Sequence, residues 1–143
     1  MKARVISKVL LSLGFVFVLG SAITQVRAGD PQDQQLPVIS IHSTGDVKRG
    51  KTGSFVLSMD PVVFGGTYVN FTVSGTAVPG VDYVPLVSPV YIGQSGYGVI
   101  LVQTLPDPRA RSFRQGYSVV VTLEPGLGYA VGEPRSAQMM IKP

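Results

Sequence analysis

The sequence predicts an all-β domain, a sandwich or a barrel, that follows an export signal. Short apolar segments recur along the chain and are separated by turn residues, in a composition with 17 glycines and 11 prolines. Two segments alternate regularly between polar and apolar positions, and no window after residue 28 has the period of an amphipathic helix. Regularly spaced short strands with alternating faces are typical of sandwiches and barrels, where one face of each strand is buried.

Seven strands are expected, separated by turn signals such as Pro79-Gly80. The second and third alternate most regularly, with Phe55, Leu57 and Met59 on one face of the second. Pro89 interrupts the fourth, which favours an edge or a bulge. The fifth is apolar on both faces, as a central strand can be. The seven ranges are Pro37–His42, Ser54–Met59, Thr67–Val73, Val87–Ile92, Gly98–Leu105, Tyr117–Leu123 and Ala137–Ile141.

Residues 1–28 have the three parts of a helical secretory signal peptide. Basic residues open the chain, an apolar run of 15 residues extends from Val9 to Ile23, and Ala28 ends a stretch that suits cleavage. The run is shorter than the roughly 20 residues that a spanning helix needs. We expect a protein that is secreted or stays in the periplasm or cell envelope, without a stable membrane anchor; retention of the signal as an anchor is the alternative. Residues 29–36 would form a flexible leader and residues 37–143 the folded domain.

Removal of the signal peptide would leave a chain with a formal net charge of zero and without cysteine. Eight of the 12 Lys and Arg residues and all eight Asp and Glu residues follow Ala28, so the formal charge of that part is zero. Nucleic-acid-binding domains carry a net basic balance, so this class of function is excluded. The chain contains no cysteine, which excludes disulfides, thiol chemistry and zinc sites with cysteine ligands.

Two short motifs follow the third predicted strand, Gly75-Thr76-Ala77 and Gly80-Val81-Asp82-Tyr83. A strand followed by G-T-A and then G-x-D-Y resembles the Calx-beta domain family, and weaker similarities extend over nearly all of Pro37–Ile141. The resemblance implies a seven-stranded, immunoglobulin-like antiparallel sandwich. It also implies a non-enzymatic module for protein interaction or adhesion outside the cytoplasm.

Some members of that family bind calcium through loops at one end of the sandwich, and this chain keeps only part of the implied ligand set. Calcium needs several oxygen ligands, largely carboxylates. Arg49 stands where an E-G pair would supply a glutamate, whereas Asp82 and Asp107 remain. We interpret Asp82 and Asp107 as vestigial positions and expect no metal or other cofactor. A calcium-binding module with a reduced site is the alternative.

Basic residues gather where the resemblance would place acidic ligands. Guanidinium groups there could take the electrostatic role of the ion and lock the loops by charge-assisted hydrogen bonds. Alternatively, they are solvated loop charges that each contribute little, or they form a patch that binds an acidic polysaccharide or lipid headgroup. This predicted cluster comprises Arg49, Lys51, Arg109, Arg111 and Arg114.

No group of residues suggests an enzyme. His42 is the single histidine, and the sequence has no G-x-S-x-G motif that could supply a serine nucleophile beside it. The expected partner is therefore a protein or a polysaccharide outside the cytoplasm. It would be bound by the loops or by strand addition at a sheet edge.

Overall fold

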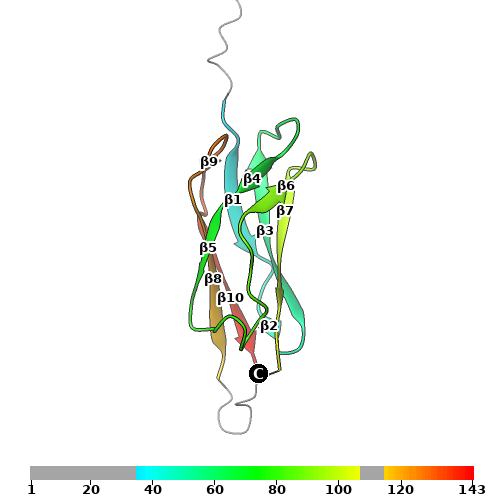
Figure 1. Ribbon diagram of the computed structural model, residues 1–143, viewed down its shortest axis with the longest axis vertical. Helices are drawn as coiled ribbons and strands as arrows, with labels where there is room; N and C mark the ends of the chain where they lie inside the picture. Colours follow the sequence, from blue (N-terminus) through cyan, green and yellow to red (C-terminus); the bar gives the residue numbers. More distant parts are fainter. Residues whose placement is uncertain (1–34, 107–114) are drawn as a thin grey trace, which may run out of the picture. The chain divides into compact units, whose positions relative to one another are not determined.

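The computed structural model describes residues 35–106 and 115–143, and its regular structure there consists of strands alone (Figure 1). The all-β prediction is confirmed. A compact unit begins at Leu36, one residue before the predicted domain. No helix in these two ranges is long and apolar enough to cross a membrane. The predicted signal peptide and most of the leader lie outside the described residues, as do Asp107, Arg109, Arg111 and Arg114.

Two four-stranded sheets form the layers of a β-sandwich. The first has the order β7-β3-β1-β9, with antiparallel pairs except for β1 and β9, which are parallel. The second has the order β2-β10-β8-β5, again antiparallel except for β10 and β2. The first sheet comprises β1 (Val38–Ser43), β3 (Thr52–Asp60), β7 (Tyr97–Gln103) and β9 (Ala130–Val131). The second comprises β2 (Val47–Lys48), β5 (Phe71–Ser74), β8 (Tyr117–Leu123) and β10 (Ser136–Lys142).

A third, two-stranded ribbon joins β4 (Thr67–Val69) and β6 (Val90–Ile92). It exists because the predicted strand Thr67–Val73 is divided at Asn70. There the backbone amide donates to the Tyr129 hydroxyl (3.1 Å) and the carbonyl accepts from the Glu124 amide (2.8 Å). These bonds replace the strand ladder at Asn70, so the chain pairs with β6 before this residue and with β8 after it.

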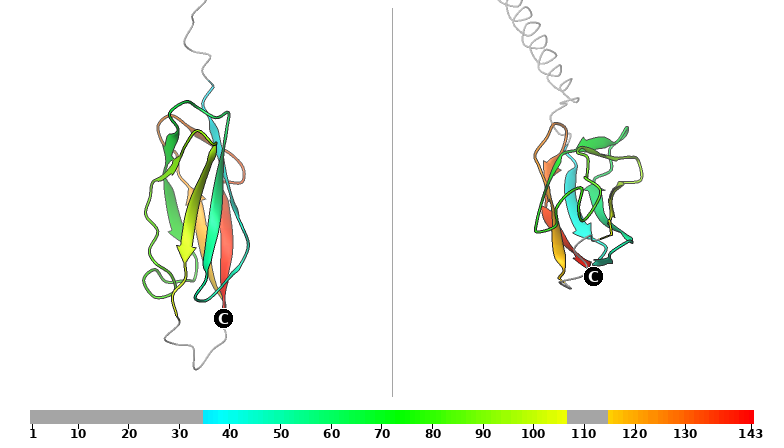
Figure 2. Two further views of the ribbon diagram at one scale, coloured as in Figure 1. Left: turned by 90° about the vertical axis from the view of Figure 1, so that its right-hand side faces the viewer. Right: turned by 60° about the horizontal axis from the view of Figure 1, so that its bottom comes forward.

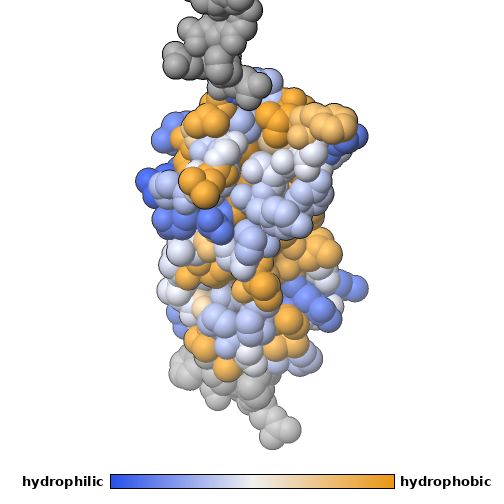
Figure 3. All heavy atoms as spheres, turned by 45° about the horizontal axis from the view of Figure 1, so that its top comes forward, coloured by the Kyte–Doolittle hydropathy of each residue, from blue (hydrophilic) through white to orange (hydrophobic). Residues whose placement is uncertain are grey.

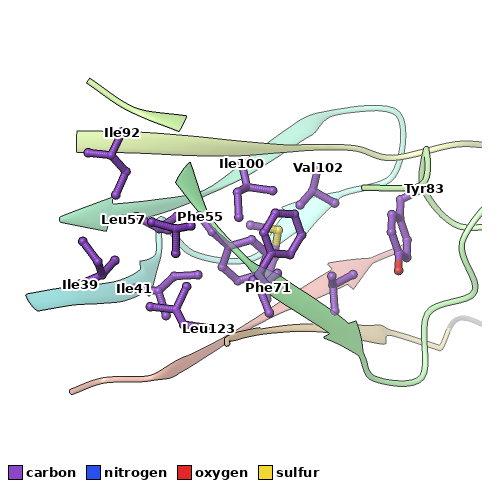
Figure 4. Packing of buried hydrophobic residues seen from close by; sticks show 14 of the residues in the cluster. Ile39, Ile41, Phe55, Leu57, Phe71, Tyr83, Ile92, Ile100, Val102 and Leu123 are labelled. Atoms are coloured by element: carbon purple, nitrogen blue, oxygen red, sulfur yellow. The ribbon is translucent and has the colours of Figure 1, made fainter. Parts of the chain in front are cut away.

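The core fills the space between the two sheets (Figure 4). Along β3 and β7 buried and more exposed side chains alternate, as a strand with one face on a core requires. Phe55 and Leu57 of β3 are fully buried, as are Val119 and Val121 of β8 from the other sheet. Burial of a large apolar side chain contributes about 1.5–3 kcal/mol, so this interleaved core is the main source of stability.

The structure differs from the predicted strands in three respects. Among the described residues there are ten strands and not seven. One is added because Thr67–Val73 is divided into β4 and β5. Two more, β2 and β9, were not predicted, because each has only two residues. These short strands make the parallel pairs, so the sandwich is mixed and not purely antiparallel. The prediction of a central position for Gly98–Leu105 was wrong: β7 is an edge strand, and its second apolar face is exposed.

Candidate functional site

The Gly75-Thr76-Ala77 motif fastens the chain to β8 at a single residue, Ser118. The amide of Thr76 donates to the Ser118 hydroxyl (3.0 Å), the Ser118 amide donates to the Thr76 hydroxyl (2.8 Å), and the Ala77 amide donates to the Ser118 carbonyl (2.9 Å). Gly75 has a φ of 113°, and a Cβ at this position would collide with the Ser118 carbonyl oxygen. Only glycine fits this backbone conformation and this approach without strain.

Asp82 organises the loop that follows. Its side chain is fully buried, and one carboxylate oxygen accepts a hydrogen bond from the Val78 amide at 2.7 Å. The backbone of Asp82 closes the same loop, because its amide donates to the Val78 carbonyl (2.8 Å) and its carbonyl accepts from the Leu105 amide (2.9 Å). The aspartate thus connects the loop to the segment that follows β7.

Arg49 approaches Asp82 from the turn after β2. One guanidinium nitrogen lies 2.8 Å from the second carboxylate oxygen of Asp82, and another donates to the Leu105 carbonyl at 3.3 Å. The guanidinium carbon also lies 5.3 Å from the ring centroid of Tyr117, within the range of a cation–π contact. Arg49 therefore ties together three segments that are far apart in the sequence.

Tyr83 lies next to this ion pair and is itself buried. Burial, and secondarily the negative charge of Asp82, raises the pKa of the Tyr83 hydroxyl above its ordinary value. The neighbouring Thr104 is also buried, and its hydroxyl donates to the Lys51 carbonyl at 2.6 Å. The surroundings of the pair are thus apolar or internally hydrogen-bonded.

Of the predicted loop residues, the structure brings Arg49 and Asp82 into direct contact. Lys51 lies in the same turn as Arg49, with an exposed side chain that makes no ion pair within residues 35–106 and 115–143. The other members of the predicted cluster, and Asp107, lie outside those ranges. Within the same ranges no group of three or more His, Asp or Glu side chains could hold a metal ion. A cation at Asp82 would compete with the Arg49 guanidinium for the carboxylate.

The second feature is one that the sequence interpretation missed. Tyr97, Val99 and Leu101 project from the outer face of β7 and are 61%, 51% and 63% exposed. β7 is the end strand of its sheet, with β3 on one side (Figure 2, left). We call these three side chains, together with the outer edge of β7, the β7 surface. The sequence feature that could have revealed this surface is that Gly98–Leu105 has apolar residues on both of its faces.

Other exposed apolar residues are dispersed. Viewed toward the end with the β3–β4 connection, hydrophobic side chains stand in separate groups among hydrophilic ones (Figure 3). Phe64 and Leu127 are almost fully exposed but lie in connections and not on a sheet. Single exposed apolar residues are ordinary on protein surfaces, whereas an ordered row on an edge strand is not.

His42 projects from the outer face of β1, opposite Val56 of β3. It is exposed, and no hydrogen bond or ion pair of its side chain occurs within the described ranges. It is therefore not part of a nucleophile–base pair in the described part of the chain. No family model matches this sequence, and a search of curated proteins gave no match.

Proposed function

We propose that this chain is a non-enzymatic, exported interaction module, a Calx-beta-like sandwich of the immunoglobulin-like type, which binds another protein outside the cytoplasm. The β7 surface is the observation that carries this proposal. An exposed row of large apolar side chains on an edge strand suits recognition by strand addition, in which backbone hydrogen bonds supply affinity and alternate side chains supply specificity.

The ion pair between Arg49 and Asp82 is a second observation that supports the proposal. A loop end held by an internal ion pair is rigid without a bound ion, so calcium is not needed to order it. The carboxylate that a reduced calcium site would use is in contact with Arg49. The predicted signal peptide would place the module outside the cytoplasm, in the secreted or envelope fraction.

Site-specific photo-crosslinking in cells that express the full chain tests this function. A photoreactive amino acid at position 101 should give a discrete adduct in the exported fraction, because Leu101 belongs to the β7 surface. The same amino acid at position 127 is the matched control, since Leu127 is even more exposed but lies in a turn. Equal labelling at both positions, or no adduct at position 101, would contradict the proposal.

Polysaccharide binding is a second candidate, favoured by one observation. Tyr68 and Tyr91 are 64% and 48% exposed and lie opposite each other in the β4–β6 ribbon, with ring centroids 5.0 Å apart. The hydroxyl of Tyr91 donates to the Gly65 carbonyl at 2.9 Å, which fixes that ring. Two neighbouring aromatic rings with polar tips, tilted by 48° to each other, offer an amphipathic surface for sugar rings. Co-sedimentation with insoluble polysaccharides, lost in Tyr91→Ala, would support this candidate over a protein partner.

A further inference from the structure

We propose that the β7 surface is a self-association site, at which two copies of this chain pair antiparallel through β7 about a two-fold axis at Ile100. This inference rests on the proposed function and names its partner, a second copy of the same chain. The observations that carry it are the hydrogen-bonding direction of β7, the absence of protection along its edge, and the symmetry of its exposed side chains.

The hydrogen-bond pattern shows which backbone groups of β7 point away from the sheet. The Met59 amide donates to the Gly96 carbonyl and the Thr104 amide to the Lys51 carbonyl, and these two pairs continue the β3–β7 register by one residue at each end. In an antiparallel ladder such bonds involve every second residue. Even-numbered residues of β7 therefore face β3, and Tyr97, Val99, Leu101 and Gln103 direct their amides and carbonyls outward.

The two ends of this outward row already have partners within the chain. The Gln103 carbonyl accepts from the Val84 amide at 2.9 Å, and the Ser95 hydroxyl contacts the amide and carbonyl of Tyr97 at 3.3 and 3.4 Å. Between them, the outward backbone groups of Val99 and Leu101 make no other backbone hydrogen bond in the described chain. The part of β7 whose outward backbone groups have no backbone partner is thus Val99–Leu101, and the bond between Gln103 and Val84 limits it on one side.

Between the Val84 contact at Gln103 and the turn that joins β6 to β7, no charged residue, proline or bulge guards this edge. Proteins protect exposed edge strands with charged side chains, prolines, bulges or very short strands. β7 has seven residues without proline or charge, and its register with β3 is unbroken from Tyr97 to Gln103. The other edge strands, β2, β5 and β9, have two to four residues.

Self-pairing fits the order of the exposed side chains. With the axis at Ile100, Val99 of each molecule lies opposite Leu101 of the other, and the outward amides and carbonyls of these two residues pair with one another. Apolar side chains that lie opposite each other across antiparallel strands pack together. An axis at Leu101 would instead require the Gln103 carbonyl, which Val84 occupies, and an axis at Val99 would require the amide and carbonyl of Tyr97, which the Ser95 hydroxyl contacts. The register with Ile100 at the centre is therefore the one that the free backbone groups allow.

Charge also favours a second copy. Three strands would continue a paired sheet on each side. Lys, Arg, Asp and Glu are absent from Val38–Ser43 and Tyr97–Gln103, and the single charged residue of Thr52–Asp60 is Asp60, at the end of that strand beyond Tyr97. A two-fold axis brings identical residues together, so any charge near it would repel its copy. An uncharged strand avoids this repulsion. Because a pairing centred on Val99–Leu101 buries less than the roughly 1,200 Å² of a stable complex, we expect a weak, reversible dimer.

Disulfide trapping tests both the dimer and its register, since the chain has no cysteine of its own. In the proposed register the Cα atoms of residue 99 and of residue 101 in the second copy are about 5.5 Å apart, within the range that a disulfide bridges. A mixture of Val99→Cys and Leu101→Cys should therefore form a covalent dimer on mild oxidation. Tyr97→Cys alone should not, because its copy lies about 20 Å away. Leu127→Cys is the control for random collisions.

Analytical ultracentrifugation of the protein purified from full-length expression gives the second measurement. The wild type should show a concentration-dependent rise in sedimentation coefficient toward that of a dimer. Val99→Pro removes an outward amide without touching the β3–β7 ladder, a position where an edge strand tolerates proline; it should fold and remain monomeric. Should Val99→Pro not fold, Val99→Lys serves the same purpose, because a lysine on an edge strand blocks pairing.

The outcomes separate this inference from the proposed function. A wild-type protein that stays monomeric at all concentrations, or a mixture of Val99→Cys and Leu101→Cys that cross-links no better than Leu127→Cys, overturns self-pairing. In that case a photo-adduct at position 101 that contains a different protein would leave the proposed function intact. An adduct of twice the chain's mass, together with the trapped dimer of Val99→Cys and Leu101→Cys, supports both.

Discussion

Arg49 donates to the carboxylate of Asp82 across 2.8 Å at one end of the sandwich, and the aspartate side chain is fully buried while the arginine side chain is 11% exposed. This geometry differs from that of a solvated loop charge, because neither partner is free to return to water without opening the loop. Removal of one partner from a buried pair leaves a charge without compensation, which is more damaging than the pair's own net contribution. For Arg49, loop locking is therefore the better interpretation.

Replacement of Arg49 measures the strength of this lock. Arg49→Met should lower the free energy of unfolding by about 3 kcal/mol, the typical loss when one partner of a buried pair is removed. Lys51→Met is the matched control: its side chain is exposed in the same turn, and the change should stay within about 0.5 kcal/mol. Urea denaturation of both variants gives the two values.

A double-mutant cycle tests whether the loss belongs to the pair. Asp82→Asn keeps an acceptor for the Val78 amide but removes the charge. If Arg49 and Asp82 stabilise each other, the loss of unfolding free energy in the Arg49→Met/Asp82→Asn protein should be smaller than the sum of the two single losses, by at least about 1 kcal/mol. Strict additivity would show that Arg49 acts through its contacts with Leu105 and Tyr117 instead.

Calcium should leave the stability of the wild-type protein unchanged. A ligand that binds the native state raises the melting temperature, but the Asp82 carboxylate already contacts Arg49 and the Val78 amide. Thermal melts with excess calcium and with a chelator should have the same midpoint. A calcium-dependent rise that disappears in Asp82→Asn would return this loop to the reduced calcium site that the sequence left as an alternative.

Tyr83 should make the protein sensitive to alkali. Burial raises the pKa of Tyr83 above the ordinary value of 10.0, so above this pH the unfolded chain loses the proton more readily than the folded one. The stability of the folded protein that depends on a protonated Tyr83 is fully present below about pH 10, and it decreases as the pH rises through the folded-state pKa. Urea midpoints between about pH 8 and about pH 11 should fall less steeply in Tyr83→Phe. Tyr68→Phe, at an exposed position, should follow the wild type.

Gly75 should be more sensitive to substitution than another glycine with nearly the same backbone angle. Gly75→Ala combines a positive φ with a collision against the Ser118 carbonyl and should cost about 3 kcal/mol of unfolding free energy. Gly45 has a φ of 118° but no atom within 4 Å of an added Cβ. Gly45→Ala should therefore cost only the conformational strain, about 1 kcal/mol. Equal losses in the two variants would mean that the approach to Ser118 has no energetic consequence.

The strand positions were largely predictable because they follow from local sequence. Phe55 and Leu57 alternate with polar neighbours, and this period of two is independent of the rest of the chain. The ends and partners of strands were less predictable. Asn70 divides a strand because Tyr129 and Glu124, distant in sequence, satisfy its backbone, and no local pattern reports such bonds. The two-residue strands β2 and β9 likewise exist only because longer strands lie beside them.

The sequence alone determined the fold class, the formal charge, the absence of thiol chemistry and the presence of Arg49 where an acidic ligand was implied. These properties depend on which residues are present and on their spacing over a few positions. Only the tertiary structure decided that Arg49 reaches Asp82 and that β7 lies at an edge with one apolar face in solvent. Both depend on contacts between segments separated by tens of residues. Strand pairing and loop packing set these contacts, and the pattern within any single strand does not encode them.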